Sequence, residues 1–213
     1  MKRFINSLLL IICSTALLWA NEAEKPSQPQ NKKDYISCFT QWDNKLHTLQ
    51  THFIQTTEFD GLLISRSEGE LSYQKDGSKL RLDNLDGEHI TQTALTDKKK
   101  IWILDDKEKE ISSLSWQEWS AGQPNKALFD FGNYTALIAN HNATVLEYKQ
   151  DTVLLKLTPK SEQENYTLYV AIKQSDCFPT DIRIVSDLMK TSAVLSDTQI
   201  NTKLNEGLFK RIK

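Results

Sequence analysis

Histidine, cysteine and carboxylate side chains are the groups with which this chain could do chemistry. The closest histidine pair, His47 and His52, is five residues apart across a predicted helix-to-strand break, whereas a metal site needs three or four converging ligands. Most aspartates fall in predicted turns, where their backbone geometry explains them. The sequence contains no glycine-rich phosphate loop, Gly-x-Ser-x-Gly or His-Glu-x-x-His. We therefore expect no catalytic residue, no metal, no cofactor and no enzymatic activity.

Two cysteines, Cys38 and Cys177, lie beyond the N-terminal region, and they form no Cys-x-x-Cys motif. In an exported chain an even number of cysteines indicates first a disulfide. Two buried thiols are the alternative, because cysteine is often simply buried. A thiol oxidoreductase is not expected.

The N-terminus has the pattern of a secretory signal peptide. Lys2 and Arg3 precede an apolar run from Leu8 to Leu18, and the small residue Ala20 follows. The run is too short for a membrane-spanning helix, which needs about 20 residues; an uncleaved anchor is the alternative. We expect residues 1–20 to be a signal peptide, residues 21–33 a flexible lead-in, and residues 34–213 a single domain.

Composition excludes one large class of partners. The formal net charge is −2 over 213 residues, and a nucleic-acid-binding face normally shows as a basic excess. The apolar content of 39% is sufficient for a globular core. We expect a globular protein that does not bind nucleic acid.

The first predicted element is an amphipathic helix capped by Asp34. At 100° per residue its apolar side chains share one face, whereas Asp43 and His47 lie off that face. Such a stripe is usually core, but it could also form one wall of a cavity. The stripe consists of Tyr35, Phe39, Trp42, Leu46 and Leu49.

Alternating polar and apolar residues from His52 to Trp116 predict successive strands. Gly61, Gly69 and Gly77 are eight residues apart, and Asp76-Gly77 between alternating runs indicates a hairpin. Strands resume after residue 140, and the last are expected at 200–204 and 208–212. The pattern predicts an antiparallel meander with one solvated face.

The segment from Trp116 to Asn140 interrupts the strands and predicts two short helices joined at Gly132-Asn133. These are apolar enough to need a surface to cover. Because a long sheet tends to curl, helices on its concave face could enclose an apolar cavity; an ordinary solid core is the alternative. The candidate cavity residues are Phe39, Trp42, Leu49, Phe53, Leu71, Tyr73, Leu80, Leu82, Trp102, Leu104, Phe129, Phe131, Tyr134 and Leu137.

Five short motifs follow one another along the chain: Phe53-Ile54-Gln55, Ser67-x-Gly69-x-Leu71-x-Tyr73, Asp97 followed by Ile101-Trp102-Ile103, Pro124 to Leu128, and Leu157-Thr158-Pro159-Lys160. In residue types and order they resemble the motifs of the periplasmic outer-membrane lipoprotein carrier family (LolA-type). Two departures stand out: Lys75-Asp76 replaces a frequent Arg-Pro, and Asp97-Lys98 replaces an Asp-Gly turn.

The resemblance implies a mostly β (α+β) fold: a curved, unclosed antiparallel half-barrel with an N-terminal amphipathic helix and an inserted helical lid. It implies a monomeric carrier in the periplasm of a Gram-negative bacterium, holding lipoprotein acyl chains or a related lipid. An inner-membrane lipoprotein-releasing transporter and an outer-membrane acceptor are the implied partners. Lys75 stands where the family's lid-latching arginine lies, although lysine lacks the bidentate fork. A lipid-sensing regulatory protein, or a carrier of another hydrophobic cargo, is the alternative.

Overall fold

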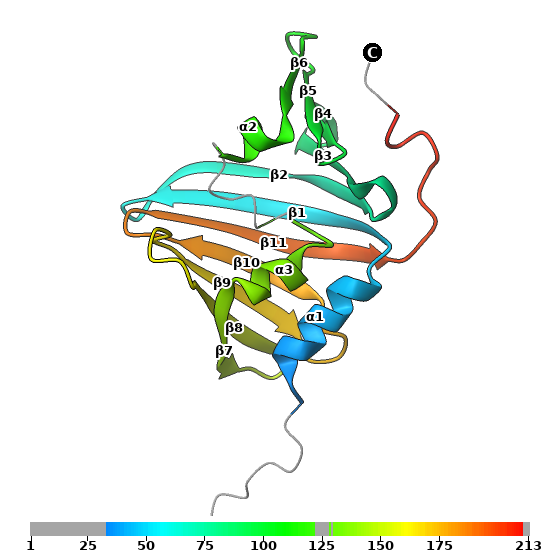
Figure 1. Cartoon of the computed structure of the whole chain (residues 1–213). Coiled ribbons are helices and arrows are strands. Elements are labelled where there is room, and N and C mark those ends of the chain that lie inside the picture. Colours follow the sequence, from blue (N-terminus) through cyan, green and yellow to red (C-terminus); the bar gives the residue numbers. More distant parts are fainter. Residues whose placement is uncertain (1–32, 122–127, 129, 211–213) are drawn as a thin grey trace, which may run out of the picture. The chain divides into compact units, whose positions relative to one another are not determined.

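Within residues 33–121, 128 and 130–210, which the computed structural model describes, eleven strands form one antiparallel sheet (Figure 1). Residues from Lys33 onward make up one compact unit. The predicted signal peptide and nearly all of the lead-in lie outside the described residues. No helix among the described residues is long and apolar enough to span a membrane.

The elements are short apart from three long strands near the middle of the sheet. In chain order they are α1 (Tyr35–Lys45), β1 (Thr48–Phe59), β2 (Leu62–Gln74), the 3-10 turn η1 (Asp76–Ser78), β3 (Lys79–Asp86), β4 (His89–Thr96), β5 (Lys100–Asp105), β6 (Ile111–Ser115), α2 (Trp116–Ala121), α3 (Tyr134–Ala139), β7 (His141–Tyr148), β8 (Thr152–Pro159), β9 (Thr167–Lys173), β10 (Pro179–Val185) and β11 (Met189–Ile200).

The first and last strands join the two halves of the sheet. The strand order is β6-β5-β4-β3-β2-β1-β11-β10-β9-β8-β7, so β1 pairs with both β2 and β11. The end strands β6 and β7 do not pair with each other, and the sheet stays open. The expected mostly β, unclosed half-barrel is therefore confirmed.

One face of this sheet, here called the inner face, carries the core. Alternation along β1 and β2 places Leu49, Phe53, Leu71 and Tyr73 on it. Aliphatic residues that pair across β8, β9 and β10 extend the core along this inner face. The helices α1 and α3 lie against the same face (Figure 1). The opposite face is called the outer face.

Gly69 on β2 lies where the backbone of β3 leaves no room for a side chain. A Cβ atom at this position would lie 1.9 Å from the carbonyl oxygen of Asp83 on β3, so any larger residue would push β2 and β3 apart. This explains the glycine within the motif Ser67-x-Gly69-x-Leu71-x-Tyr73.

Local predictions at both ends of the chain are partly confirmed. The Asp34 carboxylate accepts from the backbone N–H groups of Ile36 and Ser37, so it caps α1 as expected. The helix ends at Lys45, however, and Leu49 belongs to β1. The separate strands expected at 200–204 and 208–212 were wrong, because β11 ends at Ile200 and residues 201–210 form no strand.

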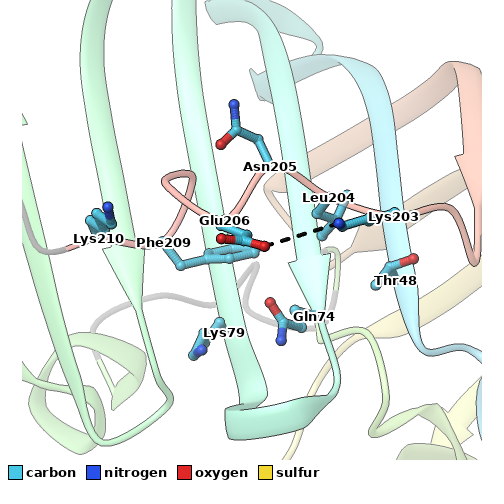
Figure 2. Close-up of a pocket in the computed structure, with 9 residues that line it drawn as sticks. All are labelled: Thr48, Gln74, Lys79, Lys203, Leu204, Asn205, Glu206, Phe209 and Lys210. Atoms are coloured by element: carbon cyan, nitrogen blue, oxygen red, sulfur yellow. Dashed lines mark ion pairs between the residues drawn. The ribbon is translucent and has the colours of Figure 1, made fainter.

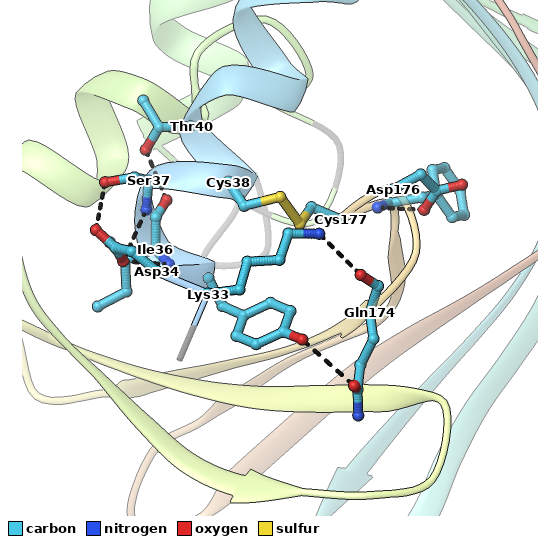
Figure 3. The surroundings of a disulfide bond; sticks show 11 residues. Lys33, Asp34, Ile36, Ser37, Cys38, Thr40, Gln174, Asp176 and Cys177 are labelled. Carbon is cyan, nitrogen blue, oxygen red and sulfur yellow. Dashed lines mark hydrogen bonds between the residues drawn. A yellow bond between two sulfur atoms is a disulfide. The ribbon is translucent and has the colours of Figure 1, made fainter. Parts of the chain in front are cut away.

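A disulfide joins Cys38 on α1 to Cys177 in the turn between β9 and β10 (Figure 3). The two Cα atoms are 5.9 Å apart, within the normal range for a disulfide. Beside it Lys33 Nζ donates to the backbone oxygen of Gln174 at 2.8 Å. The predicted pairing is confirmed, and it fastens the start of α1 to the late strands.

Candidate functional site

Most of the predicted cavity residues meet in one place. Nine of them are buried in a single cluster between α1, the inserted segment and the inner face, and Leu82 and Leu137 pack partly buried against it. Phe129 lies outside the described residues. The nine are Phe39, Trp42, Leu49, Phe53, Leu71, Tyr73, Leu80, Phe131 and Tyr134.

Trp102 and Leu104 do not belong to this group. In the sheet register Leu71 pairs with Leu82, Leu82 with Ala94, and Ala94 with Ile103. Because side chains alternate along a strand, Ile101 and Ile103 share the inner face, and Trp102 and Leu104 point to the outer face. Their assignment to the cavity was wrong. Both faces of β5 carry large apolar residues, so the sequence pattern alone could not distinguish them.

The inserted segment, defined here as Leu128 and residues 130–139, fills the interior with side chains. Leu128, Phe131 and Tyr134 have no exposed surface. The Phe131 ring lies 5.6 Å from that of Tyr134, and the Tyr134 ring lies 5.2 Å from that of Phe39. In this conformation the space between α1 and the sheet is therefore packed with protein side chains.

Asp43 on α1 holds the start of α3. Its carboxylate accepts from the backbone N–H of Gly132 at 2.8 Å and of Thr135 at 3.3 Å. The residue at the N-cap position of α3, Asn133, makes no capping bond with its side chain, so Asp43 supplies the acceptors from another helix. Asp43 is only 1% exposed, and burial raises its pKa while the hydrogen bonds from Gly132 and Thr135 lower it.

Gly132 fits only as glycine. Its φ of +77° is in the left-handed region, and an added Cβ would lie 2.0 Å from the hydroxyl oxygen of Tyr73. Burial raises the pKa of Tyr73 to about 12, with the nearby carboxylates of Asp43 and Asp130 adding to the effect. The Tyr73 hydroxyl is thus a neutral group at the base of the inserted segment.

Lys98, in the turn between β4 and β5, holds the other side of the inserted segment. Its Nζ donates to Asp130 Oδ1 at 2.7 Å and to the backbone oxygen of Phe131 at 3.1 Å. Both charged side chains are about four-fifths buried, so the pair is less screened than a surface ion pair. From the sequence, Lys98 was recognisable only as a departure from the family's Asp-Gly turn.

Lys75, the predicted latch, donates to the backbone oxygen of Asn44 at 2.7 Å. Among the described contacts it therefore binds the end of α1, and the lysine bonds to the inserted segment come from Lys98. Lys75 and Lys98 line the same pocket of about 520 Å³, together with Tyr73, Asp130 and Gly132. Both lysines thus lie beside the start of the inserted segment, but among the described contacts it is Lys98 that binds the segment.

A second pocket, of about 510 Å³, lies on the outer face (Figure 2). Thr48, Gln74 and Lys79, which are neighbours in the sheet register, form its floor, and residues 203–210 pass over them. Its rim is charged: Lys203 and Glu206 approach to 4.0 Å and are almost fully exposed. Leu204 and Phe209 also line the pocket, which contains none of the predicted cavity residues.

Comparisons with known proteins agree with this fold. The family model of the outer membrane lipoprotein carrier protein LolA matches residues 44–212. No curated protein matches the chain. One similar solved structure is MucB, with a TM-score of 0.54 and 15% identity over 84% of this chain and 62% of MucB.

Two further structures cover nearly the whole of the neighbouring chain. The lipoprotein LppX of Mycobacterium tuberculosis has a TM-score of 0.52 and 12% identity, over 80% of this chain and 95% of LppX. An uncharacterized conserved protein from Thermus thermophilus has a TM-score of 0.52 and 9% identity, over 84% and 92% of the two chains. At such identities these likenesses concern the fold alone.

Proposed function

The chain belongs to the family of the outer membrane lipoprotein carrier protein LolA, and on that premise we propose that it is a periplasmic carrier of lipoprotein acyl chains. It holds these chains, or those of a related lipid, against the inner face and moves them from the inner to the outer membrane. Its partners are an inner-membrane lipoprotein-releasing transporter and an outer-membrane acceptor. It acts as a monomer, without a cofactor and without catalysing a reaction.

The observation that carries this proposal is the composition of the wall behind the inserted segment. On β8, β9 and β10 the inner-face side chains are aliphatic and almost completely buried. Phe131 and Tyr134 are buried in the same apolar cluster as these side chains. If the inserted segment swings away from the sheet, that wall becomes available to an acyl chain.

The contacts of the inserted segment favour such a movement. Its polar anchors lie at its two ends. At the start Asp43 binds Gly132 and Thr135, and Lys98 binds Asp130 and Phe131. At the end Lys160 Nζ donates to the backbone oxygen of Ala139 at 2.7 Å, and His141 Nδ1 lies 2.7 Å from that of Leu137. A few hydrogen bonds of about 1–3 kcal/mol each hold the closed form without making it permanent. The rings contribute apolar contacts that an acyl chain can replace.

The energetics of the cargo fit a carrier that exchanges its own side chains for acyl groups. Burying an acyl chain is worth about 0.8 kcal/mol per CH₂, so one long chain resists entering water by roughly 10 kcal/mol. When an acyl chain enters, the displaced rings of the inserted segment lose apolar contacts similar to those that the acyl chain gains. Because the lost contacts offset part of the gain, the net affinity for the cargo is weaker, and the cargo can be released at its destination.

Native mass spectrometry of the protein purified from its own periplasm tests the proposal. We expect a population carrying the mass of an acylated lipoprotein or of a lipid, and displacement of that cargo by a fluorescent fatty acid. Protein that carries no acylated molecule and does not bind the fatty acid would contradict a carrier function.

A further inference from the structure

Large apolar side chains gather at one end of the sheet, on the tips of two adjacent hairpins. Leu62, Leu63 and Ile64 at the start of β2 are 72%, 61% and 59% exposed, and Phe59 and Leu188 are 47% and 56% exposed. The backbone N–H of Asp60 donates to the oxygen of Leu188 at 2.8 Å. The turns β1–β2 and β10–β11 thus form one surface (Figure 1), here called the apolar tip and defined by these five apolar residues.

The apolar tip projects beyond the neighbouring strand. The pairing of β2 with β3 ends at Glu68 and Leu85, so among the described strands residues 62–67 of β2 pair only with β1. Alternation places Phe59 on the inner face, and the hydroxyl pair of Thr57 and Thr191, 3.3 Å apart, lies between it and the core. The tip is therefore at the rim of the inner face.

The charges around the apolar tip are balanced or acidic. Behind it, Lys190 binds Glu58 at 2.9 Å and Arg66 binds Glu68 at 2.8 Å. The exposed acidic residues Asp60 and Asp187 lie in the two turns themselves. An anionic lipid surface would therefore not be attracted electrostatically to the apolar tip. A zwitterionic lipid surface would contact apolar side chains whose charged neighbours are already paired.

We propose that the apolar tip inserts into the interfacial region of a lipid bilayer. A second copy of this chain is a poor occupant, because a stable interface needs 20–30 residues on each side, and this projecting surface offers five large apolar ones. Shallow insertion needs only a few such residues. This inference goes beyond the proposed carriage of acyl chains, since it concerns contact with the membrane and requires no cargo. Contact would bring the rim of the inner face to the bilayer surface.

Co-sedimentation of the full chain with phosphatidylcholine vesicles tests this proposal. The variant Leu62→Ser/Leu63→Ser/Ile64→Ser removes exposed side chains only, and Ile111→Ser/Leu114→Ser/Leu146→Ser is a matched control at three exposed positions elsewhere. We expect the tip variant to bind at least about tenfold more weakly than the wild type. The control should bind as the wild type does, with no dependence on salt or on anionic lipid.

Three results would overturn the proposal: no binding of the wild type, equal binding of the tip variant, or binding only to vesicles containing anionic lipid. If the wild type forms a dimer that dissociates in the tip variant, and does not bind vesicles, the apolar tip contacts a second copy of the chain and not a bilayer. Fatty-acid binding by the tip variant is measured in parallel. It tests the carrier proposal, whereas vesicle binding tests the apolar tip, so the two proposals can fail independently.

Discussion

Asp43 accepts a hydrogen bond from the backbone N–H of Gly132 at 2.8 Å, although the two residues are 89 positions apart in the chain. The bond joins the N-terminal helix to the inserted segment at the point where that segment turns into α3. Since the Asp43 side chain is buried, losing this partner would leave a desolvated carboxylate. The closed interior therefore depends on a contact between two helices as well as on packing against the sheet.

Replacing Asp43 with alanine should loosen the start of α3. The N–H groups of Gly132 and Thr135 lose their acceptor, and we expect a loss of about 1–3 kcal/mol in the free energy of unfolding with faster amide hydrogen exchange at both residues. Asp34→Ala, which removes the two N–H bonds at the start of α1, is the control. It should leave exchange at Gly132 and Thr135 unchanged; equal acceleration by both variants would contradict a specific role.

Stability should also depend on pH through Asp43. Burial raises its pKa in the folded protein above the ordinary value of 3.8, so the folded state binds this proton more tightly than the unfolded state. The stability contributed by protonation is complete below pH 3.8 and is lost as pH rises through the raised pKa. Urea unfolding should thus show the wild type losing stability relative to Asp43→Asn from pH 3.8 towards neutrality. A constant difference would show that burial does not act on this group.

Replacing Lys98 with methionine should release the inserted segment from the sheet. The change leaves Asp130 without its cation and the oxygen of Phe131 without a donor, so we expect a loss of about 1–3 kcal/mol. Binding of a fluorescent fatty acid should become tighter because opening costs less. In Lys109→Met the lost ion pair, with Asp106, is exposed, and both quantities should stay near those of the wild type. Weaker fatty-acid binding by Lys98→Met would argue against the latch.

Removing the disulfide should lower stability without altering the site. Cys38 and Cys177 are 139 residues apart, and closing so long a loop is worth about 4–5 kcal/mol in the chain-entropy model. The double variant Cys38→Ala/Cys177→Ala should show this loss in denaturant unfolding at a temperature where it remains folded. Thiol labelling of the denatured, unreduced wild type should find neither cysteine free. A double variant as stable as the wild type would mean that the bond adds nothing.

Much of the fold could be predicted from local patterns. The Asp60-Gly61 and Asp76-Gly77 turns occur where the alternation of side chains reverses, because these residue types tolerate the turn conformations. The disulfide was predicted from the even number of cysteines in a chain that begins with a signal-peptide pattern. Each of these features depends on a few adjacent residues or on the number of cysteines, and both can be read from a single sequence.

The contacts that hold the interior closed could not be predicted, because they join distant residues. Helical projection places Asp43 off the apolar stripe, and only the inserted segment, 89 residues later, buries it. Lys98 lies in a turn where a charged residue is usually just solvated, and its partner Asp130 is not adjacent in sequence. Trp102 was assigned to the wrong face because apolar residues occupy both faces of β5.

The central claim is that the inserted segment must leave the inner face before an acyl chain can enter. Thr135 Oγ1 donates to Asn44 Oδ1 at 3.2 Å, so Asn44→Cys/Thr135→Cys offers a disulfide that would lock α3 to α1. The most direct test is the affinity of this variant for a fluorescent fatty acid before and after reduction, with the wild type under both conditions as control for the native disulfide. We predict that the locked form does not bind and that reduction restores binding to the wild-type level. Binding by the locked form as tight as that of the wild type would contradict the claim.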